Sequence, residues 1–358
     1  MEQTKDITAM LDLMLRPAFS VKDGKVDHLN HAAACLSLAA GTPVSELLLT
    51  GTQEYSEMTE GCLYLNISIC GHSCGASVTK MDSADIFLLE QQNELSQLQS
   101  MALAARELRE PLANIMVAAD RLLPTLEESG DEGSRQQAAR INRSLHQMLR
   151  LVSNMSDASR YSTEPEPRME LQNFSAVTEE IFERAAELLE HSGTALRFKG
   201  LREDVCCLMD AERVERAIYN LISNAVKFSP SGSTVDAVLT RRADKLYLTV
   251  QDSGSGIAPS IQGSIYSRYL RQPAIEDSRH GIGLGMVMVR AAAAAHGGTV
   301  LMEQLPSKGT RITVTFAIRK TASFDLRSPR LRVDYTGERD HGLIELSDAL
   351  PPEAYHNI

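Results

Sequence analysis

Three polar side chains recur along one predicted helix in the second half of the chain. In ERAIYNLISNAVKFS, Asn220, Asn224 and Lys227 are spaced by four and three residues, so they share one helix face. Amide oxygens can bind a hard cation such as Mg²⁺, and a lysine beside them can contact phosphate oxygens. The alternative is that they are ordinary helix-surface residues. A ligand is favoured, because an unpaired polar group on a buried helix costs about 1–3 kcal/mol.

Two glycine-rich segments follow this helix. In DSGSGI, after a predicted strand, Asp252 can accept a hydrogen bond from an exocyclic amine, and Gly254 and Gly256 let the backbone approach a ring closely. The second segment, GIGLGMVMV, precedes a predicted helix, whose N-terminal N–H groups suit a polyphosphate. Its three glycines are Gly281, Gly283 and Gly285. Each segment alone is a weak signal.

Together, in this order and spacing, the three segments resemble the N, G1 and G2 boxes of the GHKL ATP-binding domain of sensor histidine kinases. SIYSRYLR (264–271) is similar to the F box of that family. The resemblance implies an α/β sandwich that binds ATP and Mg²⁺, with Asn220 and Asn224 as metal ligands and a lid over residues 264–285. The nucleotide-binding residues that it implies are Asn220, Asn224, Lys227, Phe228, Asp252, Gly254, Gly256, Ile257, Arg268, Gly281, Gly283, Leu284 and Gly285.

Two long helices are predicted before this unit. Apolar residues step by threes and fours on both sides of the polar loop LEESGDEGS, which indicates an antiparallel helical hairpin. One hairpin cannot bury its seam alone, so two chains are expected to pair into a four-helix bundle. Pro111 should bend the first helix locally. The seam residues are Leu98, Ala102, Ala105, Leu108, Leu112, Ile115, Ala119, Leu122, Ile141, Leu145, Met148, Val152 and Met155.

The stretch RELREPL (106–112) on the first helix resembles the H box, typically His-Glu-Leu-Arg-Thr-Pro-Leu. Arg106 stands at the phosphoacceptor position, and Glu107 stands at the position of the general base. A guanidinium has a pKa above about 12 and offers no lone pair to a γ-phosphate, so self-phosphorylation there is not expected. Glu110 replaces the Thr or Asn that positions water for phosphatase activity in the family, so that activity is in doubt too.

Three other histidines are candidate substitute acceptors. His146 is expected to be a partly exposed residue of the bundle, and His280 a residue of the lid. His296 lies in a His-Gly-Gly turn usual for the family. None of the three lies in an acceptor motif.

The N-terminal unit is expected to be a mixed α+β structure with an antiparallel sheet. FSVKDGKVDHL alternates apolar and polar residues around an Asp-Gly pair, which is typical of a β-hairpin. The unit resembles a short PAS sensor domain. Cys70, His72 and Cys74 provide too few ligands for an ordinary zinc site, so they are interpreted as structural residues.

Composition excludes several functional classes. The net charge of −11 and pI of about 5.4 argue against binding to nucleic acid or anionic lipid. No run approaches the roughly 20 apolar residues of a membrane helix, and the N-terminus does not resemble a secretory signal. Six cysteines indicate no disulfide framework, so the expected location is the cytoplasm.

The predicted fold class is therefore α+β, with four parts. They are a PAS-like sensor domain (1–88), a HisKA-like dimerisation hairpin (89–160), a GHKL ATP-binding domain (161–320) and a C-terminal tail (321–358) that packs back through LIEL.

Two functions are consistent with this organisation. The first is a kinase-type protein that binds Mg-ATP for phosphoryl transfer in two-component signalling, with transfer in trans to a partner kinase. The second is a pseudokinase that binds ATP and regulates its partner by conformation. The expected partners are a second copy of the chain through residues 89–160, and a response regulator or a partner histidine kinase. A third possibility, an anti-sigma type serine kinase, is disfavoured by the complete hairpin.

Overall fold

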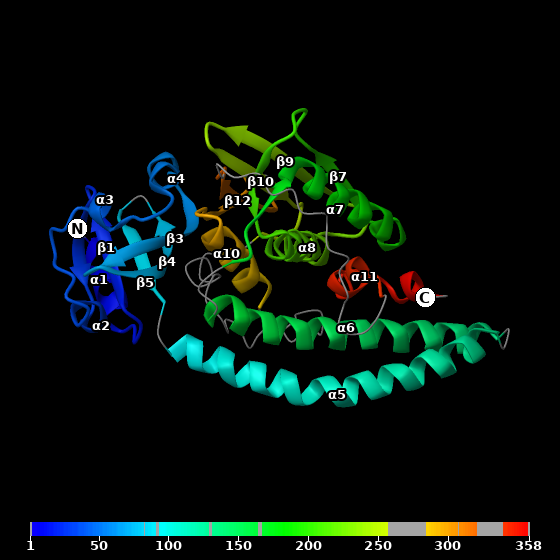
Figure 1. The fold of residues 1–358 in the computed structure, drawn as a ribbon. Helices are drawn as coiled ribbons and strands as arrows, with labels where there is room; N and C mark the ends of the chain where they lie inside the picture. The colour runs from blue at the N-terminus through cyan, green and yellow to red at the C-terminus, as the bar shows by residue number, and fades with distance from the viewer. Residues whose placement is uncertain are drawn as a thin grey trace.

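The structure is a computed structural model that describes residues 2–81, 83–90, 93–128, 131–163, 167–256, 284–306, 308–320 and 339–356. Figure 1 shows an N-terminal α/β unit, a long helical hairpin and a C-terminal α/β unit that lies along the hairpin. Within these ranges, every helix is too short or too polar to serve as a membrane span. The mixed α+β fold class expected from the sequence is confirmed.

The N-terminal unit is an antiparallel sheet flanked by short helices. Asp23 and Gly24 both have positive φ and turn the predicted hairpin. The strand order is β2-β1-β5-β4-β3. Its elements are α1 (Glu2–Asp12), β1 (Ala18–Lys22), β2 (Lys25–Leu29), α2 (His31–Ala34), α3 (Val44–Leu47), α4 (Thr52–Glu57), β3 (Gly61–Ile69), β4 (His72–Lys80) and β5 (Asp85–Leu89).

The hairpin consists of α5 (Asn93–Glu128) and α6 (Glu132–Thr163). Their shared core contains Ala105, Leu112 and Ala119 from α5, and Leu145 and Val152 from α6. The helix α5 stays continuous through Pro111 and Pro124 and is bowed along its length (Figure 1).

The C-terminal unit packs helices against one face of a mixed sheet, because β7 pairs with β9 in parallel and the other strands pair antiparallel. The amphipathic helix α8 buries one whole side against this sheet. The elements are β6 (Glu170–Asn173), α7 (Phe174–Leu189), η1 (Glu190–Ser192), β7 (Ala195–Lys199), β8 (Cys206–Met209), α8 (Ala211–Phe228), β9 (Thr234–Arg242), β10 (Lys245–Gln251), α10 (Gly285–Ala295), β11 (Val300–Gln304) and β12 (Thr310–Ala317).

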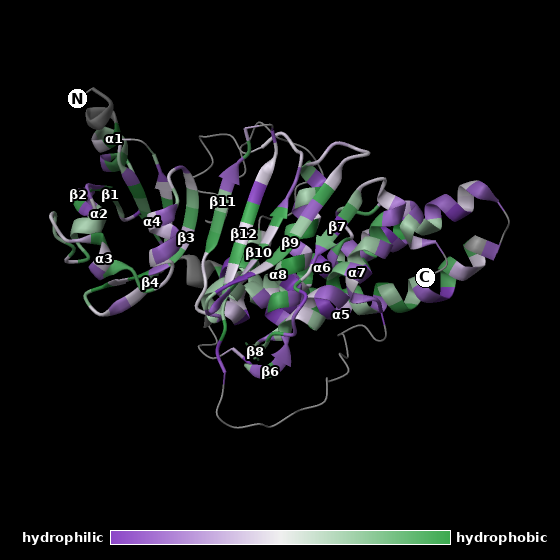
Figure 2. Cartoon of the chain, turned by 90° about the horizontal axis from the view of Figure 1, so that it is seen from above, coloured by the Kyte–Doolittle hydropathy of each residue, from purple (hydrophilic) through white to green (hydrophobic). Residues whose placement is uncertain are grey.

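The two sheets join into one. Strand β3 of the N-terminal unit pairs antiparallel with β11 of the C-terminal unit, with Tyr64 opposite Val300. The result is a ten-stranded sheet, which Figure 2 shows from above. Strands β6 and β8 are not part of it and pair with each other as a separate two-stranded sheet.

The chain ends in a short segment that contains α11 (His341–Glu345) and η2 (Pro352–Tyr355). Figure 1 shows it between α6 and the C-terminal unit. The expectation that LIEL packs back is confirmed, because residues 343–346 are all buried.

Candidate functional site

The helix α8 carries the predicted cation- and phosphate-binding residues. Asp210 begins the helix, and its side chain accepts a hydrogen bond from the backbone N–H of Arg213 at 3.1 Å. Asn220 is buried, and its amide nitrogen donates to the carbonyl of Arg216 at 2.8 Å. Its oxygen accepts from Nη2 of Arg150 on α6 at 3.2 Å. The expected metal ligand Asn220 is therefore held by an arginine of the hairpin.

The other residues of this helix face lie nearer to solvent. Asn224 is half-buried, and its amide nitrogen lies 3.8 Å from the sulfur of Met286. Lys227 lies 3.9 Å from Asp348 of the C-terminal segment. Phe228 is exposed at the end of the helix.

Asp252 directly follows β10 and is almost completely buried. Its Oδ1 accepts hydrogen bonds from the backbone N–H groups of Gly254 at 2.8 Å and Thr310 at 3.1 Å. Burial raises the pKa of Asp252, and these two hydrogen bonds partly oppose the rise. Within the part of the chain that the structure describes, Oδ2 accepts no hydrogen bond. A buried carboxylate oriented in this way can accept one from an amine of a ligand.

Glycines bring the three segments together at α8. A Cβ on Gly254 would lie 2.5 Å from the carbonyl oxygen of Phe228, so this position has no room for a side chain. Gly256 has a φ of +77°, which favours glycine. A Cβ on Gly285 would lie 2.9 Å from Oδ1 of Asn220. One glycine-rich segment therefore meets the C-terminal end of α8, and the other meets Asn220 near the middle of this helix.

Leu284, just before α10, is buried against the hairpin in a cluster with Leu98 and Tyr161. The remaining predicted binding residues lie outside the described residues, as does His280. They are Ile257, Arg268, Gly281 and Gly283.

These residues fit the adenine end of a nucleotide better than the phosphate end. Oδ2 of Asp252, which lies beside two glycines, suits an adenine amine. At the phosphate end, Asn224 offers an amide to Mg²⁺, but Asn220 is engaged by Arg150 and Lys227 faces a carboxylate. The side chains that could bind Mg²⁺ and phosphate are thus present, but two of them, Asn220 and Lys227, already contact other residues of the same chain.

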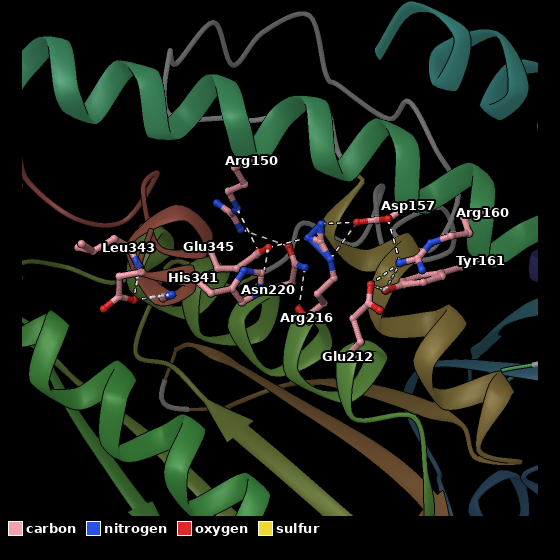
Figure 3. Close-up of polar contacts among 12 residues, drawn as sticks. Arg150, Asp157, Arg160, Tyr161, Glu212, Arg216, Asn220, His341, Leu343 and Glu345 are labelled. Carbon is pink, nitrogen blue, oxygen red and sulfur yellow. Dashed lines mark hydrogen bonds and ion pairs between the residues drawn. The ribbon is translucent and has the colours of Figure 1, made fainter. Parts of the chain in front are cut away.

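A buried ionic network connects α8 with α6 and α11. This network was not expected from the sequence. Arg216 on α8 donates to Asp157 of α6 through Nε at 3.1 Å and to Glu345 of α11 through Nη1 at 2.6 Å (Figure 3). Arg150 extends the network through Nη1 to Ser223 at 3.1 Å. The signal in the sequence was indirect, since it consisted of charged residues within otherwise apolar stretches.

The segment that resembles the H box, residues 106–112, lies away from this site. Arg106 and Glu107 are exposed on α5. Arg109 is half-buried and donates to Ser156 of α6 at 2.8 Å. In Figure 1, α6 lies between α5 and the C-terminal unit. Within one chain, therefore, position 106 does not face the residues around Asn224.

Two other histidines are structural. The expectation that His146 is partly exposed is wrong: it is completely buried under the ring of Tyr355, with 5.0 Å between ring centroids. Burial lowers the pKa of His146. His296 is buried too, and its Nε2 accepts a hydrogen bond from the backbone N–H of Asp210 at 3.0 Å.

Cys70 lies in the turn between β3 and β4, and Cys74 lies in β4. Cys70 is exposed, whereas Cys74 is half-buried in β4. Burial, aided by the charge of Glu90, raises the pKa of the Cys74 thiol to about 11. This thiol is therefore a poor nucleophile near neutral pH.

Two family models match the chain. The model of the histidine kinase-, DNA gyrase B- and HSP90-like ATPase matches residues 209–320. The model of the His Kinase A (phospho-acceptor) domain matches residues 96–164. The first match contains α8 and the glycine-rich segments, and the second contains the hairpin.

Several known proteins are similar to the chain. The hybrid signal transduction histidine kinase D of Dictyostelium discoideum is 31% identical over 241 residues, which are 63% of this chain and 15% of that protein. The sensor-like histidine kinase SenX3 of Mycobacterium tuberculosis is 26% identical over 278 residues, which are 74% of this chain and 67% of that protein.

Among solved structures, full-length ShkA in complex with AMPPNP has a TM-score of 0.49 at 20% identity, covering 63% of this chain and 47% of that chain. The family matches place the helical hairpin before the C-terminal unit, hereafter the ATPase unit, in the order expected from the sequence. By these matches and by its curated relatives, the chain belongs to the two-component sensor histidine kinase family.

Proposed function

We propose that the chain binds Mg-ATP between α8 and the glycine-rich segments and acts in two-component signalling. The observation that carries this proposal is Asp252. It is buried and its Oδ1 is fixed by two backbone N–H groups, while its Oδ2 is left for the amine of adenine. A Cβ on Gly254 would collide with the carbonyl oxygen of Phe228, and a Cβ on Gly256 would collide with the side chain of Gln304, so neither position has room for a side chain.

Asn224 would hold the Mg²⁺ ion, and Asn220 would join it only after Arg150 releases its amide oxygen. The metal supplies charge neutralisation for the polyphosphate. Lys227 would contact phosphate oxygens as a point charge. Phe228, Ile257, Arg268, Gly281, Gly283, Leu284 and Gly285 complete the proposed nucleotide site.

Phosphoryl transfer to position 106 does not occur in this proposal. The guanidinium of Arg106 remains protonated and has no lone pair for attack on phosphorus. Glu107 then has no imidazole to orient. Any phosphoryl group from bound ATP goes in trans to the acceptor of a partner histidine kinase.

A regulatory role without phosphoryl transfer is the second candidate, and two observations favour it. The first is the arginine at position 106. The second is the contact of Lys227 with a carboxylate of the same chain. In this role the chain pairs with a partner kinase and signals by conformation.

The hairpin, residues 89–160, is proposed to form the homodimer. Apolar residues of α5 that recur every seven positions, Leu108, Ile115 and Leu122, are 46–63% exposed in the single chain. Such a stripe beside a packed seam is what a four-helix bundle buries. A response regulator or a partner histidine kinase is the proposed recipient of the signal.

The N-terminal unit, residues 1–88, is proposed to be a PAS-like sensor domain. Its support is the five-stranded antiparallel sheet with three short helices between β2 and β3. The ATP-binding domain is proposed to span 161–320 and the tail 321–358.

The test is incubation of the full chain with Mg²⁺ and ATP labelled on the γ-phosphate. The wild type is expected to bind ATP but to stay unlabelled, whereas Arg106→His restores the nucleophile and gains acid-labile label. Asn224→Ala should weaken Mg-ATP binding by about tenfold. Labelled wild type would overturn the proposal about position 106, and absence of ATP binding would overturn the nucleotide site. If ATP binds and neither protein is labelled, the regulatory role is favoured.

A further inference from the structure

Residues 339–356, here named the C-terminal clasp, pack between the hairpin and the ATPase unit. Leu343, Leu346 and Tyr355 are buried in the core of the ATPase unit. Ile344 is buried in the core of the hairpin. One short segment therefore packs against both the ATPase unit and the hairpin.

Polar contacts fix the clasp on α6. The carbonyl of Ser347 accepts hydrogen bonds from Arg143 at 3.3 Å and Gln147 at 3.2 Å. The amide of Asn142 donates to the carbonyl of Tyr355 at 3.3 Å. The hydroxyl of Tyr355 donates to the carbonyl of Leu343 at 2.8 Å and closes the clasp on itself. The segment is thus held by direction-specific bonds as well as by apolar packing.

A carboxylate of the clasp lies at the expected phosphate end of the nucleotide site. Asp348 accepts a hydrogen bond from Nη1 of Arg150 at 2.8 Å and lies 3.9 Å from the ammonium of Lys227. The same Arg150 holds the amide oxygen of Asn220. The clasp therefore places one anion near the lysine and binds the arginine of α6 that engages an amide of α8.

A polyphosphate and this carboxylate cannot share Lys227 without mutual repulsion. Binding of the nucleotide and closure of the clasp are then linked, and each weakens the other by the same factor. The apparent affinity for ATP is reduced in proportion to the fraction of molecules whose clasp is open.

We propose that the C-terminal clasp is an internal anionic ligand, in which Asp348 occupies the place of a nucleotide phosphate at Lys227 and competes with Mg-ATP. The inference rests on the proposed nucleotide site, whose regulation it describes. A signal or partner that withdraws the clasp allows the site to bind Mg-ATP. A partner that stabilises the packed clasp prevents this binding.

The experiment compares Mg-ATP affinity in full-length wild type, Asp348→Asn and Tyr355→Phe by calorimetry. Asp348→Asn keeps the shape of the side chain but removes its charge, and should bind ATP about five- to tenfold more tightly. Tyr355→Phe changes no charge near the nucleotide and only loosens the clasp, so it should gain about threefold. The matched control is Glu353→Gln, which removes one negative charge from an exposed position of the same segment.

Hydrogen exchange of the backbone amides of residues 343–350 provides the second measurement. Saturating Mg-ATP is expected to accelerate exchange there in the wild type. Unchanged affinity in both clasp variants, together with unchanged exchange on ATP addition, would overturn the competition while leaving ATP binding intact. If no variant binds ATP, the proposed nucleotide site itself is wrong, and the competition fails with it.

Discussion

Arg216 is a buried cation whose charge is balanced by residues from two other elements. Burial alone would lower the pKa of Arg216, but the carboxylates of Glu345 and Asp157 outweigh that effect and raise it. Burial likewise would raise the pKa of Glu345, yet Arg216, His341 and Arg150 hold it below its ordinary value. Nε of Arg150 lies 3.7 Å from this carboxylate, which is an ion pair rather than a hydrogen bond.

We predict that Glu345→Gln destabilises the folded chain by about 3 kcal/mol at pH 7, because Arg216 and Arg150 lose the buried counter-charge that they share. Asp157 and Asp348 then each balance one of these arginines alone. Since folding lowers the pKa of Glu345 from 4.5, its ion pairs contribute fully above pH 4.5, and the contribution decreases as the pH falls below that value. Urea titrations at pH 7 and pH 4 measure both effects.

The exposed Glu353→Gln should change stability by less than about 0.5 kcal/mol at either pH. Equal losses for Glu345→Gln at pH 7 and pH 4 would show that its charge is not the stabilising feature.

At the scale of elements, α5 carries two apolar stripes with different roles. The stripe through Ala105, Leu112 and Ala119 is buried against α6, whereas the stripe through Leu108 and Ile115 is exposed. Both stripes repeat every seven residues, and each residue of one lies three positions from a residue of the other. In the sequence alone they therefore appear as a single apolar seam. The structure divides it into a face that closes the hairpin and an exposed face, which the proposed homodimer would bury.

Ile115→Glu is predicted to convert a dimer into a monomer, because four-helix packing would bury the new charge without a partner. The matched control is Asn114→Glu, which places the same charge about 100° around the helix on an exposed position. Light scattering of both variants measures the molar mass. A dimeric Ile115→Glu would mean that this stripe is not the interface.

At the scale of the whole molecule, the continuous sheet connects the N-terminal unit to the ATPase unit. Beside the β3–β11 pairing, the buried Glu54 of α4 accepts hydrogen bonds from Lys245 of β10 at 2.7 Å and from Tyr247 at 3.1 Å. Arg290 of α10 forms an ion pair with Glu90, which follows β5. The N-terminal unit is therefore fixed to the sheet that supports Asp252.

Lys245→Ala is predicted to leave the carboxylate of Glu54 buried without its cation, at a cost of about 2 kcal/mol. Differential scanning calorimetry should show the N-terminal unit unfolding at a lower temperature, separated from the ATPase unit. The control, Lys199→Ala, removes an exposed lysine from β7 and should not separate the transitions. Coincident transitions in Lys245→Ala would mean that this contact does not couple the units.

The helices and strands, and the residues of the proposed nucleotide site, could be predicted from short stretches of the sequence. The Asp23-Gly24 turn, the heptad spacing of the hairpin and the face shared by Asn220 and Asn224 depend on residues within one or two turns of each other. Local spacing fixes side-chain direction in a helix or strand, so these features were predictable from the residues. The replacement at Arg106 is likewise a matter of one residue's chemistry.

The tertiary structure alone decided which partners these faces meet. Arg150 lies 70 residues from Asn220 and 198 residues from Asp348 along the chain, and no local pattern relates them. The same holds for the pairing of β3 with β11 and for the burial of His146 under Tyr355. Such contacts arise because distant segments compete to bury apolar area and pair charges, a choice made by the whole fold rather than by any short stretch.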